Sequence, residues 1–174
     1  MYALRYDTPI DAVERYSLSI FLAAPTVRGH QQYLQPSWRV AAADLFREKG
    51  FDGALIIPEF GDITESDKDR MDIPLWEYEG LKTADCIMFW VPRTRELIGL
   101  TTNFELGYWM KDREKLVYGR PPHAYRTDYP DILWKKDYKE RGIGDPTIYN
   151  TLEDTIDAAI KVATRVKTQK GSVA

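Results

Sequence analysis

Apolar runs alternate with amphipathic stretches along the chain. Four short runs are apolar at nearly every position, and they lie at 18–24 (LSIFLAA), 54–58 (ALIIP), 85–91 (DCIMFWV) and 115–118 (KLVY). Such runs are typical of strands that helices cover on both faces. They therefore predict the strands of a buried, mostly parallel sheet.

Helix start signals separate these runs. Each predicted helix begins at a residue whose side chain can accept a hydrogen bond from the first turn. These N-cap residues are Ser37, Asp72, Asn103 and Thr151. We predict helices from Ser37 to Gly50, over 75–84, over 104–111 and from Thr151 onward, with a partly helical stretch at 129–139.

Alternating strands and helices predict an α/β fold. Right-handed crossovers place helices on both faces of a parallel sheet, and four or five strands favour the order 2-1-3-4-5. A chain of 174 residues suits one domain. We expect a lead-in at 1–17 with room for a short edge strand, the domain at 18–168 and a flexible tail at 169–174.

This strand order predicts where a ligand binds. The strands at 18–24 and 85–91 become neighbours, and the chain leaves them in opposite directions, which opens a crevice at their carboxyl ends. The loop at 25–30 follows the first of them, although its composition also fits an ordinary connection. Glu77 and Glu105 are each expected in the first turn of a helix at the same edge.

The two glutamates suggest a reaction. Near a helix N-terminus Glu105 should be ionised and able to act as a nucleophile, whereas Glu77, between Trp76 and Tyr78, suits a drier position and proton donation. Such a pair on either side of an acetal carbon performs retaining glycoside cleavage. Two surface glutamates that complement helix dipoles would give the same pattern.

Composition and net charge limit the kinds of molecule that the protein is expected to bind. The net charge is −3 with no basic run, which argues against polymeric nucleic acid. The N-terminal stretch has no apolar signal region, and no apolar window approaches the ~18–20 residues of a membrane span. We therefore expect a cytoplasmic protein with no membrane partner. Cys86 lies in an apolar strand and the histidines are His30 and His123, so we expect no metal site.

A longer motif carries a family resemblance. It reads W-E-x-x-x-L-x-x-A-D, then an apolar strand, P-R, a loop and T-T-N-x-E-x-G. Its residues are Trp76, Glu77, Leu81, Ala84, Asp85, Pro92, Arg93, Thr101, Thr102, Asn103, Glu105 and Gly107. With FLAAPT, the SW pair of the first helix, FDGALIIPE and GRPP, it resembles the nucleoside 2-deoxyribosyltransferase-like family over roughly 18–123.

The resemblance implies a flavodoxin-like fold and a nucleoside substrate. Members cleave the N-glycosidic bond of 2′-deoxynucleosides and pass the sugar to another base or to water, without a cofactor. Glu105 falls on the nucleophile and Glu77 on the acid that exchanges a proton with the base. Substrate contacts are expected at Ala24, Pro25, Thr26, Trp76, Pro92, Arg93, Thr102 and Asn103. Relatives complete the site from a neighbouring subunit, so a homo-oligomer is expected.

Two departures from the better-known transferases stand out. Gly99 occupies the position of an Asp that helps hold the sugar, and Phe21 replaces a strand Tyr that orients the nucleophile. Sugar contacts must then come from Thr101, Thr102 or Asn103. Hydrolysis of (deoxy)nucleosides or their 5′-monophosphates stays open, with Arg93 and Arg120 as candidate phosphate ligands. A catalytically silent nucleotide-binding module is the third alternative.

Overall fold

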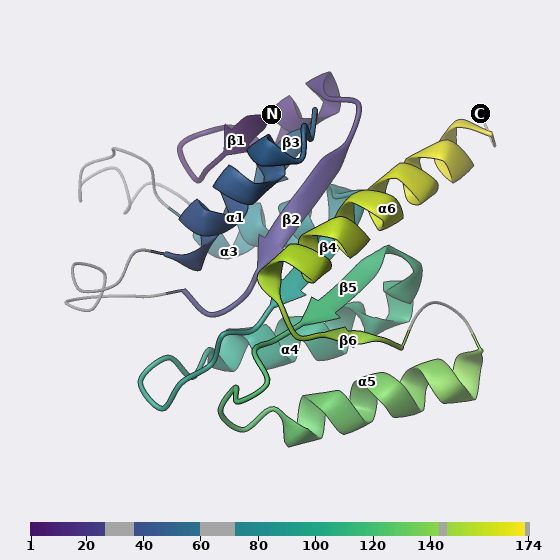
Figure 1. Cartoon of the computed structure of the whole chain (residues 1–174). Helices are drawn as coiled ribbons and strands as arrows, with labels where there is room; N and C mark the ends of the chain where they lie inside the picture. The colour runs from purple at the N-terminus through teal and green to yellow at the C-terminus, as the bar shows by residue number, and fades with distance from the viewer. Residues whose placement is uncertain (27–36, 60–71, 143–145, 173–174) are drawn as a thin grey trace.

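A parallel sheet organises the described part of the chain, residues 1–26, 37–59, 72–142 and 146–172. In the computed structural model this sheet has six strands in the order β1-β3-β2-β4-β5-β6 (Figure 1). The strands are β1 (Tyr2–Leu4), β2 (Ser19–Ala23), β3 (Ala54–Ile56), β4 (Cys86–Trp90), β5 (Leu116–Gly119) and β6 (Ile148–Tyr149).

Helices cover both faces of the sheet. They are the α-helices α1 (Trp38–Glu48), α3 (Ile73–Thr83), α4 (Leu100–Trp109), α5 (Asp128–Arg141) and α6 (Leu152–Gly171), with the 3-10 helices η1 (Ile10–Arg15) and η3 (Met110–Lys115). Figure 1 shows α1 and α6 in front of the sheet, with α3 and α4 behind it.

Side chains of the apolar strand β2 pack into the hydrophobic clusters on both faces of the sheet. Ile20 and Leu22 pack in the cluster that includes Ala42 of α1 and Ala159 of α6. Phe21, one residue away, packs in the opposite cluster with residues of α3 and α4. Successive side chains of a strand point to opposite faces, so a strand covered on both faces must be apolar at every position.

The predicted α/β fold with a parallel sheet is confirmed. The run β3-β2-β4-β5-β6 follows the predicted order 2-1-3-4-5, with a fifth strand, β6, that the sequence had not located, and β1 is the short edge strand for which the lead-in left room, beside β3. The sheet therefore has six strands instead of four or five, and its order in full chain numbering is 1-3-2-4-5-6. β1 has only three residues, and a strand that short shows no reliable hydrophobic pattern in the sequence.

Three of the four predicted N-caps are confirmed. The side chains of Ser37, Asp72 and Thr151 accept hydrogen bonds from the backbone N–H groups of their helices. The prediction of Asn103 was wrong, because α4 begins at Leu100 and its N-cap is Gly99. Gly99 has a left-handed backbone (φ 60°) and no capping side chain, so the usual start signal is absent.

Because α3 and α4 begin earlier than predicted, Glu77 and Glu105 lie farther from the helix N-termini than expected. α3 begins at Ile73 and α4 at Leu100, and neither helix has an acidic residue in its first turn. Glu77 and Glu105 thus lie in second turns, and the predicted placement in first turns was wrong. At the other end of the chain, α6 continues to Gly171, so residues 169–171, which we expected in the tail, are helical.

The predicted partly helical stretch at 129–139 is confirmed, because it lies within α5. No helix among the described residues combines the length and the apolarity that crossing a bilayer requires.

Asp85 ties three elements together at the start of β4. Its buried carboxylate accepts hydrogen bonds from the backbone N–H and the hydroxyl of Ser19, at 3.1 and 3.0 Å. Lys170 Nζ of α6 lies 2.9 Å from the other oxygen. One carboxylate therefore links β4 to the start of β2 and to the end of α6.

Replacing Asp85 tests this link. Asp85→Ala leaves the buried Ser19 N–H without its acceptor, so the free energy of unfolding should fall by about 1–3 kcal/mol. Urea unfolding of the purified variant measures this loss. Asp44→Ala, which removes an exposed ion pair with Arg47 on α1, is the control and should change little. Equal losses in the two variants would contradict the role of Asp85.

Candidate active site

A cavity of about 330 Å³ lies where β2 ends. This volume falls in the range of roughly 300–1,000 Å³ that is usual for small-molecule sites. The end of β2, a residue that follows β3, α1, α3 and the segment that opens α4 all contribute to its wall. The lining residues are Phe21, Ala23, Ala24, Thr26, Arg39, Pro58, Glu77, Glu96, Leu97, Ile98, Gly99, Leu100, Thr101 and Glu105.

The cavity brings the two candidate carboxylates together. Glu77 reaches it from α3 and Glu105 from α4, although 28 positions separate them in the chain. Ala24 and Thr26, two of the predicted substrate contacts, line the same cavity. The cavity thus lies at the carboxyl end of β2, where the crevice was expected, and residues 96–101 that follow β4 form part of its wall together with both glutamates.

Five other predicted contacts do not line the cavity: Trp76, Pro92, Arg93, Thr102 and Asn103. The indole N–H of Trp76 donates to the carbonyl of Thr8 at 2.9 Å. Buried Arg93 donates to Asn103 Oδ1 at 2.7 Å and to the Arg126 carbonyl at 3.1 Å. Thr102 is buried, and its hydroxyl lies beside Gly99, where an added Cβ would be 3.1 Å from its Oγ1.

Arg120, a candidate phosphate ligand, binds a protein carboxylate. Its Nε and Nη2 lie 2.9 and 2.6 Å from one oxygen of Asp131. The other oxygen of Asp131 accepts from the Tyr118 hydroxyl at 2.8 Å. The Asp131 carboxylate raises the pKa of Arg120. This arginine thus fixes the start of α5 and does not line the cavity.

Pro25, the remaining predicted contact, packs against the residue that opens α4. A Cβ atom placed on Gly99 would lie 2.4 Å from Pro25 Cγ and 2.8 Å from Pro25 Cβ. The backbone of Gly99 is also left-handed, with φ +60°. An Asp at this position, as in the better-known transferases, would strain the backbone and collide with Pro25.

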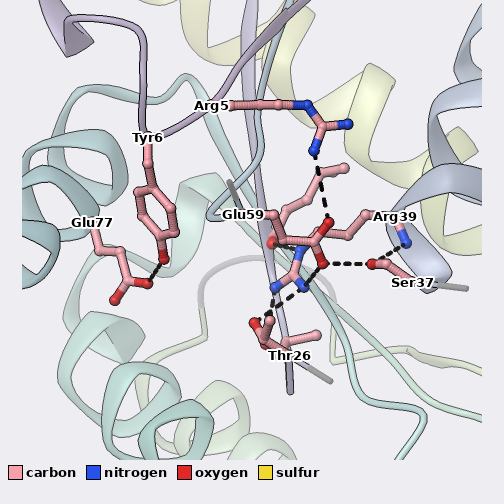
Figure 2. Close-up of polar contacts among 9 residues, drawn as sticks. Arg5, Tyr6, Thr26, Ser37, Arg39, Glu59 and Glu77 are labelled. Carbon is pink, nitrogen blue, oxygen red and sulfur yellow. Dashed lines mark hydrogen bonds and ion pairs between the residues drawn. The ribbon is translucent and has the colours of Figure 1, made fainter. Parts of the chain in front are cut away.

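Arg39 is a cavity residue that the sequence did not reveal. Its buried guanidinium donates to the carbonyls of Leu22 and Ala24 at 3.0 and 2.9 Å, and to Thr26 Oγ1 at 3.3 Å. Nη1 also lies 2.9 Å from Glu59 Oε1. Burial lowers the pKa of Arg39, and the charge of Glu59 opposes that shift. Figure 2 shows Arg39 between Glu59 and Thr26.

Further contacts hold Glu59 beside Arg39. Ser37 donates its hydroxyl to Glu59 at 2.5 Å, and Arg5 Nη1 lies 3.9 Å from the second oxygen of Glu59. Burial lowers the pKa of Arg39, and the charge of Glu105 opposes that shift less than Glu59 does.

Tyr6 is the second residue that the sequence did not reveal. Its hydroxyl donates a hydrogen bond to Glu77 Oε1, as Figure 2 shows. Tyr6 lies in the polar lead-in, 71 positions before Glu77. No local pattern links two residues at that separation, so sequence reasoning had no signal for this contact.

The contact between Gly99 and Pro25 yields a prediction with an internal control. Gly99→Ala should lower the free energy of unfolding by about 1–3 kcal/mol, because it combines backbone strain with the collision. Gly50 has φ +67°, but a Cβ atom placed on it would meet nothing within 4 Å, so Gly50→Ala carries the backbone strain alone. Urea unfolding should therefore show the larger loss for Gly99→Ala, and equal losses would contradict the packing argument.

Comparison with known protein families finds a match that spans both glutamates. A family model described as "Nucleoside 2-deoxyribosyltransferase like" matches residues 17–123, which is more than half of the chain and includes Glu77 and Glu105. A search of curated proteins finds no match. Given the extent of the family match and a parallel α/β sheet of the expected order, the chain belongs to the nucleoside 2-deoxyribosyltransferase-like family.

Proposed function

We propose that the protein cleaves the N-glycosidic bond of 2′-deoxynucleosides and transfers the deoxyribosyl group to another base. The observation that carries this proposal is the cavity that Glu77 and Glu105 both line. Membership of the family supports a nucleoside as the substrate. A pair of carboxylates at one substrate-sized cavity is the equipment that double displacement at an anomeric carbon requires.

In the first half-reaction the Glu105 carboxylate attacks C1′. The C1′–N bond breaks, its electron pair stays with the base, and Glu77 donates a proton to the departing nitrogen. The product is a deoxyribosyl ester of Glu105 and a free base. In the second half-reaction a nitrogen of another base attacks C1′, the ester bond breaks, and Glu77 takes the proton of the incoming base.

The surroundings of Glu105 support its role as nucleophile. Because Glu105 lies in the second turn of α4, the helix N-terminus is not the main source of its activation. Arg39, which lines the same cavity and is paired with Glu59, is close enough that the charge of Glu105 opposes the lowering of its pKa by burial. An ionised carboxylate is the form that attacks C1′.

Thr101 is the best candidate for contact with the sugar. Of the three residues expected to replace the missing Asp, Thr101 lines the cavity, whereas Thr102 is buried and Asn103 accepts a hydrogen bond from Arg93. Thr101 also lies in the first turn of α4, where backbone N–H groups lack partners within the helix. Its hydroxyl and this backbone suit a sugar hydroxyl.

An unphosphorylated nucleoside fits the charges of the cavity better than a 5′-monophosphate. Among the described lining residues there are three carboxylates, those of Glu77, Glu96 and Glu105, and the single cation is Arg39. The guanidinium of Arg39 already donates to two carbonyls, a threonine and Glu59. Among the described lining residues, a phosphate would meet repulsion from the carboxylates, and the only cation, Arg39, is already engaged.

Replacing the nucleophile tests the proposed function. Glu105→Gln should reduce base exchange between a deoxynucleoside and free adenine or cytosine by roughly 10³-fold or more, because no ester can form. Chromatography of the products with and without the acceptor base measures exchange. In the native protein, mass spectrometry should locate a trapped deoxyribosyl adduct on Glu105. Exchange that survives in Glu105→Gln would refute the assignment, and free deoxyribose in place of exchange would favour a hydrolase.

The role of Glu77 gives a separate prediction. Glu77→Gln should slow cleavage most for deoxynucleosides with poor leaving bases and least for those with activated bases, because only poor leaving groups need the proton. Initial rates over a series of leaving bases measure the difference. Glu79→Gln, on the same helix and paired with Lys82 at the surface, is the matched control. A uniform loss over the series would show that Glu77 positions the substrate instead of moving a proton.

A further inference from the structure

We propose that Tyr6 is a positioning residue for Glu77 and selects the carboxyl oxygen that exchanges the proton with the base. This inference rests on the proposed function and adds a residue to it. Tyr6 lies outside the matched family region, residues 17–123. The strand position from which better-known transferases present a tyrosine is here occupied by Phe21, which has no hydroxyl.

The ring of Tyr6 is held in place by its neighbours. Tyr6 is buried, with 7% of its surface exposed. Its backbone N–H donates to the carbonyl of Glu59 at 3.3 Å. Its ring meets Trp76 edge to face with centroids 5.0 Å apart, and the Trp76 indole in turn donates to Thr8 at 2.9 Å. The hydroxyl therefore reaches Glu77 from a fixed direction.

The hydrogen bond distinguishes the two oxygens of Glu77. Tyr6 donates to Oε1, so Oε1 is occupied by a donor and Oε2 is the oxygen that carries the exchangeable proton. When Glu77 has given its proton to the departing base it is a carboxylate, and a hydrogen bond to a charged acceptor is stronger than one to a neutral acceptor. Tyr6 thus stabilises the state that follows proton transfer.

The same contact serves both half-reactions. Before the incoming base arrives, Glu77 is a carboxylate whose orientation the Tyr6 hydroxyl keeps. Oε2 then accepts the proton of the incoming base in the second step. The hydroxyl of Tyr6 keeps its proton through both steps. It acts on the reaction through its hydrogen bond to Glu77 and not on the substrate.

Deleting the hydroxyl oxygen of Tyr6 separates its hydrogen bond to Glu77 from the packing of its ring. Tyr6→Phe keeps the ring contact with Trp76 and deletes the donor. With a poor leaving base, kcat should fall by about 10- to 100-fold, the loss expected for a hydrogen bond to a charged group. KM should change little, because Tyr6 is not placed to touch the substrate. With an activated leaving base the loss should be much smaller.

A double-mutant cycle provides the decisive comparison. In a Glu77→Gln background, Tyr6→Phe should cause little further loss, since the residue through which it acts has already been altered. The matched control is Tyr16→Phe, because Tyr16 also lies in the lead-in, where its ring stacks on Tyr2 at 5.1 Å. This control should leave kcat unchanged. An equal loss from Tyr6→Phe in both backgrounds, or none in the native background, would overturn the inference.

A spectroscopic readout keeps this test distinct from that of the proposed function. In protein labelled with ¹³C at the tyrosine Cζ, the Tyr6 signal is the one that Tyr6→Phe removes. It should shift on Glu77→Gln and stay in place on Glu79→Gln. If no nucleoside is turned over, the proposed function fails, while this shift still reports the hydrogen bond. A Tyr6 signal that is indifferent to Glu77→Gln would overturn the inference even in an active enzyme.

Discussion

The site depends on the hydrogen bonds and the ion pair that the buried guanidinium of Arg39 makes. A parallel strand that ends in the interior leaves carbonyls that need donors, and Arg39 satisfies those of Leu22 and Ala24. A buried cation is destabilising unless it is paired, and Glu59 at 2.9 Å provides the pair. Several charge-assisted bonds thereby offset the burial of one charge and give the end of β2 a single conformation.

This anchor connects segments that are distant in the chain. Ser37, the N-cap of α1, donates to Glu59 and so joins the helix that carries Arg39 to the end of β3. Arg5 and Tyr6 of the lead-in meet the same glutamate, one through its side chain and one through its backbone. Arg39 and Thr26, which line the cavity, thus belong to a polar cluster that joins the lead-in, the end of β2, the segment after β3 and the start of α1.

Two glycines bring the helices of the carboxylates close to β2. At Gly80 of α3, an added Cβ would lie 2.9 Å from the ring of Phe21, so the helix of Glu77 packs directly on the strand. At Gly99 the start of α4 packs against Pro25 in the same way. The helices of Glu77 and Glu105 therefore approach β2 and the residues after it closely, because neither glycine has a side chain that would hold them apart.

The sequence by itself determined the parallel sheet and most helix starts, and it pointed to the two glutamates that the fold brings to one cavity. Apolar runs and N-cap residues act within a few positions, so they can be recognised without the rest of the chain. Only the tertiary structure decided that the edge strand allowed for in the lead-in pairs with β3, that Gly99 caps α4, that Arg39 lines the cavity, that Tyr6 contacts Glu77, and that Arg93 does not line the cavity. The reason is physical: which side chains meet across tens of residues depends on how helices pack on the sheet, and no local pattern records that packing.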